Sequence, residues 1–136
     1  MSKRQNDPED YIIYRGEAVF SSLNKFPYNV GHVMIIPSRH VESFEELEDQ
    51  ESMETLKVLK VCIAAVRAVL KPDGFNIGVN IGPSAGAGVQ HFHLHLVPRW
   101  IGDTNFMPIL SDTKVLSQSL DRISSALSEE IRKQVS

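Results

Sequence analysis

Three of the five histidines in this chain of 136 residues stand at alternate positions of one short apolar segment, QHFHLHLVPRW, Gln90 to Trp100. Successive side chains of an extended strand point to opposite faces, so His91, His93 and His95 would share one face. The other face would point into the core and carry Phe92, Leu94 and Leu96. The segment therefore predicts a half-buried β-strand that presents a row of imidazoles.

Further strand signals occur along the chain. β-Branched and aromatic residues on both sides of Arg15-Gly16-Glu17 predict a β-hairpin over residues 11–24. HVMIIP, residues 32–37, predicts a strand that ends at Pro37, because proline lacks the donor needed to continue a ladder. FNIGVNIG, residues 75–82, predicts another strand. Its apolar face would carry Phe75, Ile77, Val79 and Ile81, and its opposite face Asn76, Gly78 and Asn80.

Two helices complete the expected domain. The apolar period of residues 51–70 predicts one amphipathic helix of about five turns, which Lys71-Pro72-Asp73-Gly74 ends. Residues 43–46, SFEE, match a capping box before a short helical turn. A C-terminal helix is expected because one stripe collects Leu116, Leu120, Ile123, Leu127 and Ile131. The predicted architecture is α+β, an antiparallel sheet with one long helix on it and a C-terminal helix that packs locally or on a partner.

Length and composition favour a single cytoplasmic domain. Residues 1–10 are a polar lead-in and residues 11–136 are expected to form one domain. The net charge of -3, with both signs interspersed, gives no broad basic surface, so nucleic acid is not an expected partner. Cys62 is the only cysteine and no signal-peptide pattern is present, which favours a reducing compartment. The longest apolar run, residues 61–70, is too short to span a bilayer.

The histidine face has three possible interpretations: a solvated surface, a metal site or a catalytic site. Alternate residues of a strand lie roughly 6.6 Å apart and the outer pair about 13 Å apart, whereas ligand nitrogens must converge to about 2 Å from zinc. All three histidines would reach one ion only with strain. No metal is therefore expected.

A catalytic site would use the same spacing differently. An imidazole that donates one N–H to a backbone carbonyl keeps its other nitrogen as a nucleophile at neutral pH, and His93, in the centre, is best placed to attack. The small-residue loop GPSAGAGV, residues 82–89, precedes the strand. Its backbone N–H groups would meet the oxygens of a phosphoryl substrate. The chemistry of this pattern favours attack on phosphorus.

The order His91-Phe92-His93-Leu94-His95-Leu96-Val97 resembles the signature of the histidine triad (HIT) superfamily of nucleotide hydrolases and transferases. Residues 23–47 resemble the upstream block of that family, and residues 74–88 resemble its strand and phosphate loop. The resemblance extends over residues 11–120. Within the superfamily, VPRWIGDTNFMPIL, residues 97–110, resembles the branch of diadenosine tetraphosphate (Ap4A) phosphorylases.

This resemblance implies a HIT-like fold with a five-stranded antiparallel sheet, usually in a homodimer whose two sheets join into one. It implies that His93 attacks the α-phosphorus of an adenine nucleotide and forms an AMP-histidine intermediate, which water or inorganic phosphate then releases. His95 would bind the phosphate and assist the leaving group. His91 and His32 would orient the strand and set the tautomers of their neighbours, and Asn24 would bond the ribose hydroxyls.

The resemblance also implies further substrate contacts. Asn80 and the loop positions Gly86, Gly88 and Val89 would bind phosphate. Trp100 is expected to stack on a base or fill a dimer contact for a separate reason, because aromatic residues are enriched at recognition surfaces. Many family members carry a glutamine and a serine or threonine where this chain has Ala87-Gly88, so the loop offers only backbone donors there. The N-terminal cysteine pair of many zinc-binding members is missing as well, so no structural zinc is expected.

The leading hypothesis is a nucleotide phosphohydrolase or phosphorylase that cleaves Ap4A-like dinucleoside polyphosphates. Two alternatives stay open: an adenosine phosphoramidase of the AMP-lysine type, and a nonenzymatic nucleotide-binding signalling module. The covalent mechanism requires no cofactor, although a divalent cation can accompany the nucleotide. The expected partners are the adenine nucleotide, inorganic phosphate for a phosphorylase, and a second copy of the chain, but not a membrane.

Overall fold

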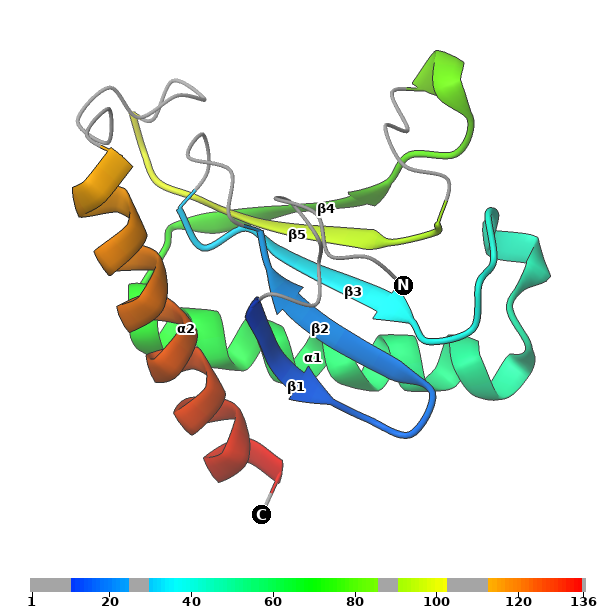
Figure 1. Ribbon diagram of the computed structural model, residues 1–136, viewed down its shortest axis with the longest axis horizontal. Helices are drawn as coiled ribbons and strands as arrows, with labels where there is room; N and C mark the ends of the chain where they lie inside the picture. The colour runs from blue at the N-terminus through cyan, green and yellow to red at the C-terminus, as the bar shows by residue number, and fades with distance from the viewer. Residues whose placement is uncertain (1–10, 25–29, 86–90, 103–112, 136) are drawn as a thin grey trace.

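The computed structural model describes residues 11–24, 30–85, 91–102 and 113–135, with side chains from residue 120 onward in the last range. Within them the chain forms one five-stranded antiparallel sheet, in the order β1-β2-β3-β5-β4, and two α-helices (Figure 1). The elements are β1 (Ile12–Arg15), β2 (Val19–Leu23), β3 (Val33–Pro37), η2 (Phe44–Glu46), α1 (Asp49–Leu70), β4 (Gly74–Val79), η3 (Pro83–Ala85), β5 (Leu94–Arg99) and α2 (Thr113–Val135). The α+β architecture is as predicted.

The predicted N-terminal hairpin is formed by β1 and β2. Its turn is closed by a bond from the Gly16 N–H to the Val19 carbonyl, 2.8 Å. A Cβ at Gly16 would lie 2.4 Å from Oε2 of Glu54, so the turn leaves no room for a side chain there. The hairpin is thereby seated directly on α1.

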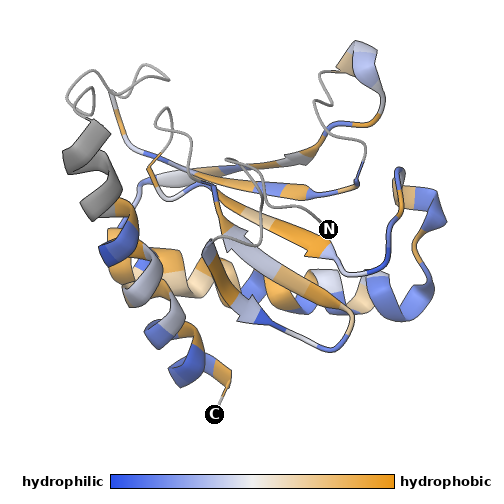
Figure 2. Cartoon of the chain, in the orientation of Figure 1, coloured by the Kyte–Doolittle hydropathy of each residue, from blue (hydrophilic) through white to orange (hydrophobic). Residues whose placement is uncertain are grey.

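Helix α1 covers one face of the sheet (Figure 1) and begins two residues before the predicted start. Its buried residues Val58, Cys62, Ala65 and Val66 form one core with residues of the sheet, among them Val33, Ile35, Leu94 and Leu96. In Figure 2, β3, which contributes to this core, is mostly hydrophobic, whereas the first turn of α1 is hydrophilic. The helix ends at Lys71, which adopts a left-handed conformation with φ 52°.

The C-terminal helix packs on its own domain, against α1 and β1. Leu120, Leu127 and Ile131 are buried and Ile123 packs against the core, so the predicted stripe is confirmed at these positions. The side chain of Leu116 lies outside the described residues. None of the described helices combines the length and the apolar character needed to cross a membrane.

The capping box predicted at residues 43–46 is wrong. The Ser43 hydroxyl donates to the Glu45 carboxylate instead of a backbone N–H, and the Glu46 carboxylate accepts the N–H of Glu42. η2 is only a three-residue 3₁₀ turn. The first turn of α1 is stabilised by another carboxylate, because Glu51 Oε1 accepts the N–H of Glu48 at 2.7 Å.

Strand β4 lies at the edge of the sheet and is covered less than its sequence pattern predicts. Phe75 and Val79 pack against the core, but Ile77 is 47 % exposed. Ile81, assigned to the same face, lies beyond the strand and is 41 % exposed. The reason is the position of β4 in the sheet. An edge strand has a neighbour on one side only, so fewer apolar side chains of the domain pack against it.

Candidate active site

The histidines lie on the face of the sheet opposite α1. Phe92, Leu94 and Leu96 are buried, and the residues between them are half-buried, as the alternation predicts. β5 itself begins only at Leu94, so His91 and His93 precede the strand and His95 is within it. The row of imidazoles therefore starts in a connecting segment and continues along the sheet.

His93 has one ring nitrogen bound to the backbone. Its Nδ1 lies 3.0 Å from the carbonyl oxygen of His91. Because a carbonyl oxygen can only accept, Nδ1 carries the proton and Nε2 keeps its lone pair. This is the geometry that a nucleophilic imidazole needs.

His95 is the end of a hydrogen-bonded relay that starts at Asn24. The amide nitrogen of Asn24 lies 3.3 Å from Nδ1 of His32, and Nε2 of His32 lies 2.9 Å from Nδ1 of His95. An amide nitrogen only donates, so His32 accepts at Nδ1 and donates from Nε2. His95 then accepts at Nδ1 and carries its own proton on Nε2, from which it can donate a hydrogen bond to a leaving oxygen.

Burial disfavours the charged forms of His32, His91 and His95. Burial and the nearby His95 and His93 lower the pKa of His32 from its usual 6.5 to about 4. Burial also lowers the pKa of His95, with a smaller contribution from His93, and lowers the pKa of His91 against the opposing effect of its bond to Pro37. Charging any of the three is disfavoured because the charged ring would lose its water.

His91 contacts β3 through its side chain. Its Nε2 donates to the carbonyl oxygen of Pro37 at 2.9 Å, and its ring centroid lies 5.1 Å from that of His40. His40 was not among the predicted site residues, although it stands in the upstream block that resembles the HIT family. Ring contacts at 4.5 Å between His93 and His95, and at 5.0 Å between His95 and His32, continue the row.

No group of three or more histidine, cysteine or acidic side chains is arranged to hold a metal ion among the residues described. The hydrogen bonds account for part of this. His32 and His95 direct nitrogens at each other, and His91 directs one at a carbonyl. Those nitrogens are not turned toward a common point.

The other predicted site residues are spread along the sheet. Asn80 directly follows the register pair Val79–Leu94, which places it at the histidine end of the ladder. Trp100 follows the other end of β5, roughly 20 Å from His93 for a strand of that length, so one chain does not bring the two together. The loop positions Gly86, Gly88 and Val89 lie outside the described residues.

Comparison with known proteins adds to this geometry. The HIT domain family matches residues 5–100. An AP-4-A phosphorylase of Mycobacterium tuberculosis is 41 % identical over 116 residues, which are 85 % of this chain and 60 % of that protein. An uncharacterised HIT-like protein of Saccharolobus solfataricus is 38 % identical over 97 residues, 71 % of this chain and 70 % of that protein. The chain thus spans about 60 % of the length of the mycobacterial relative.

The fold is shared with solved structures. A hypothetical histidine triad nucleotide-binding protein from Sulfolobus tokodaii superposes with a TM-score of 0.77 at 30 % identity, covering 90 % of this chain and 84 % of the other. Both kinds of similarity therefore lead to the same family.

Proposed function

We propose that this chain, which belongs to the HIT family, cleaves dinucleoside polyphosphates such as Ap4A through an AMP group held covalently on His93. The observation that carries the proposal is the bond from His93 Nδ1 to the His91 carbonyl, 3.0 Å, which leaves Nε2 as the nucleophile. The 41 % identity to an AP-4-A phosphorylase supports the choice of substrate.

In the first step, Nε2 of His93 attacks the α-phosphorus of the nucleotide. A nitrogen–phosphorus bond forms, and the bond from phosphorus to the bridging oxygen breaks. The leaving nucleotide, ATP in the case of Ap4A, departs as its anion while the Nε2–H of His95 donates a hydrogen bond to the bridging oxygen that it takes with it. The relay from Asn24 through His32 supports this assignment because it sets the tautomer of His95.

In the second step, inorganic phosphate or water attacks the same phosphorus and His93 leaves. His95 keeps its Nε2–H directed at the phosphoryl group, and the proton that an attacking water loses passes to solvent. Phosphate gives ADP and water gives AMP. Asn24, beside His32, is proposed to contact the ribose, and Asn80 with the backbone of Gly86, Gly88 and Val89 to contact the phosphates.

Incubation with Ap4A, with and without phosphate, tests the proposal when the nucleotide products are separated. ADP formed only with phosphate identifies a phosphorylase, and AMP with ATP identifies a hydrolase. His93→Ala should abolish both reactions. No turnover under either condition, or turnover that survives His93→Ala, would falsify the mechanism. Turnover of an adenosine phosphoramidate far above that of Ap4A would select the phosphoramidase alternative.

We also propose that the chain forms a homodimer through β4. The strand has a free edge among the described residues and exposes Ile77. Two-fold pairing of identical edges is antiparallel, so the Trp100 end of one copy would lie beside the histidine end of the other. Ile77→Lys should give a monomer by light scattering. A dimer unaffected by this charge would exclude the β4 edge.

A further inference from the structure

The segment that carries the proposed nucleophile lies outside the sheet. At this end, the ladder of β3 with β5 stops at the pair Ile35–Leu94, and the ladder of β4 with β5 stops at Val79–Leu94. His91 and His93 come before those pairs. Their placement therefore depends on something other than strand pairing.

That support is the loop between β3 and α1, residues 38–48, together with the end of β3. Nε2 of His91 donates to the Pro37 carbonyl at 2.9 Å. The N–H of Phe92 donates to the carbonyl of buried Val41 at 2.7 Å. The Phe92 ring lies edge-on to Phe44, with centroids 5.5 Å apart. Every one of these contacts joins the histidine segment to the chain between Pro37 and the start of α1.

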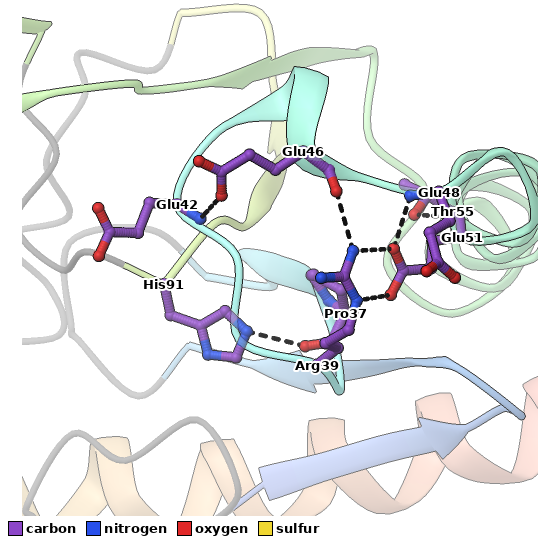
Figure 3. Close-up of polar contacts among 8 residues, drawn as sticks. All are labelled: Pro37, Arg39, Glu42, Glu46, Glu48, Glu51, Thr55 and His91. Carbon is purple, nitrogen blue, oxygen red and sulfur yellow. Dashed lines mark hydrogen bonds and ion pairs between the residues drawn. The ribbon is translucent and has the colours of Figure 1, made fainter.

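The loop is itself attached to α1 by one ion pair (Figure 3). Nη2 of Arg39 donates to Oε1 of Glu51 at 2.8 Å, and Nε of Arg39 donates to Oε2 at 3.1 Å. The same Nη2 reaches the carbonyl of Glu46, 2.8 Å away, so the guanidinium also closes the loop on itself. Two parallel hydrogen bonds of this kind fix the orientation of the guanidinium on the carboxylate as well as the distance between them.

Glu51 is an unusual residue for a helix surface because its side chain is only 6 % exposed. Its Oε1 also accepts the N–H of Glu48, which holds the carboxylate against the first turn of α1. The hydrogen bonds from Arg39 and from the Glu48 backbone lower the pKa of Glu51. The carboxylate thus stays charged and attached to the helix while Arg39 holds the loop.

We propose that the Arg39–Glu51 pair positions the nucleophile. Glu51 fixes Arg39, Arg39 fixes the loop that follows Pro37, and the loop fixes His91, whose carbonyl accepts from Nδ1 of His93. Both residues act through others, so they are positioning residues. This inference rests on the proposed function, because it assigns the pair to the orientation of a nucleophilic His93.

The chain offers a matched control on the same helix. Glu54, one turn after Glu51, accepts the N–H groups of Ala18 at 2.9 Å and Val19 at 3.0 Å. It therefore also attaches a loop to α1, but that loop joins β1 to β2 and carries no histidine. Glu54→Gln removes the same charge from the same helix while the loop that holds His91 is unchanged.

The experiment compares Arg39→Ala, Arg39→Lys, Glu51→Gln and Glu54→Gln with the wild type, each at a temperature where it is folded. Nitrogen-15 NMR without nucleotide, at about pH 8 where histidines are neutral, reports which ring nitrogen of His93 carries the proton. Rapid quenching with Ap4A gives the rate of AMP transfer to His93, and substrate titration gives KM separately.

We expect Arg39→Ala and Glu51→Gln to mix the two tautomers of His93 and to slow AMP transfer on the order of tenfold to a hundredfold, with a much smaller change in KM. Arg39→Lys keeps the charge but not the fork, so its transfer rate should fall between wild type and Arg39→Ala. Glu54→Gln should keep the wild-type tautomer of His93 and the wild-type rate of AMP transfer, even if the substitution lowers the midpoint of unfolding.

A wild-type tautomer and rate in folded Arg39→Ala would overturn the inference. An equal loss in Glu54→Gln would overturn it too, since the effect would then follow general stability. A wild-type chain that forms no AMP adduct would overturn the proposed function separately, because the NMR spectrum is read without nucleotide.

Discussion

Nε2 of His32 lies 2.9 Å from Nδ1 of His95, although 63 residues separate them in the chain. His32 directly precedes β3 and His95 lies in β5, so the bond links two neighbouring strands. Because His32 is 9 % exposed, the bond is shielded from water, which strengthens it. Because of this bond, a change in the protonation of His32, or a mutation beside it, should alter the hydrogen bonding of His95.

The first prediction concerns stability at acidic pH. The pKa of His32 is about 4 in the folded chain and 6.5 at its usual value, so between these pH values the unfolded chain binds a proton that the folded chain does not. The free energy of unfolding should therefore fall as pH falls through this window, by up to about 3 kcal/mol from His32. Below about pH 4 the contribution is lost completely.

Urea titrations at several pH values, on wild type and His32→Asn, provide the measurement. His91 and His95 also have lowered pKa values and add to the same trend in both proteins. The difference between the two proteins isolates His32. Equal pH slopes in both would contradict the assignment.

A second prediction tests the relay at Asn24. An aspartate accepts where the asparagine amide donates, so Asn24→Asp should draw a proton onto Nδ1 of His32 and raise the pKa of His32. His32 could then no longer serve as a neutral Nε2–H donor with an accepting Nδ1. NMR of the imidazoles should show this change for Asp but not for Asn24→Ala. An unchanged His32 spectrum in Asn24→Asp would exclude the relay.

A third prediction concerns Gly31, the residue before His32. Gly31 has φ +78°, and an added Cβ would lie 2.4 Å from Cδ1 of Leu70. Gly82 has φ +83°, but apart from its chain neighbours no atom of the described residues lies within 4 Å of an added Cβ. Gly82→Ala should cost about 1 kcal/mol from backbone strain alone, whereas Gly31→Ala should cost about 2–4 kcal/mol. Urea unfolding measures both free energies. Equal decreases in the two variants would show that the Leu70 side chain moves aside at little cost.

The fourth prediction concerns α2. Leu127 is fully buried, so Leu127→Ala should lower the free energy of unfolding by about 2–5 kcal/mol. Val135, on the same helix but 50 % exposed, serves as the control, and Val135→Ala should cost about 0.5 kcal/mol or less. Similar small losses in both variants would mean that α2 adds little to the domain core.

Local patterns predicted most of the fold because they depend on neighbours in the chain. The period of α1 and the hairpin at Gly16 correspond to observed elements, and the period of two around His93 matches the alternating burial there, although β5 begins only at Leu94. The capping box predicted at Ser43 does not form, because the Ser43 hydroxyl donates to the Glu45 carboxylate. Sequence spacing alone does not reveal which nearby group a hydroxyl will bond. The exposure of Ile77 was missed because edge position depends on strand order.

The sequence by itself determined that three imidazoles share one face, because alternation on an extended chain needs no tertiary information. Only the tertiary structure decided which nitrogen each ring presents. That choice depends on groups distant in the chain, since His95 takes its tautomer from His32 and His91 is bound to Pro37. Arg39 and Glu51 belong to no recognisable motif, and folding alone brings the Glu51 carboxylate against Arg39 in the loop that supports the histidines.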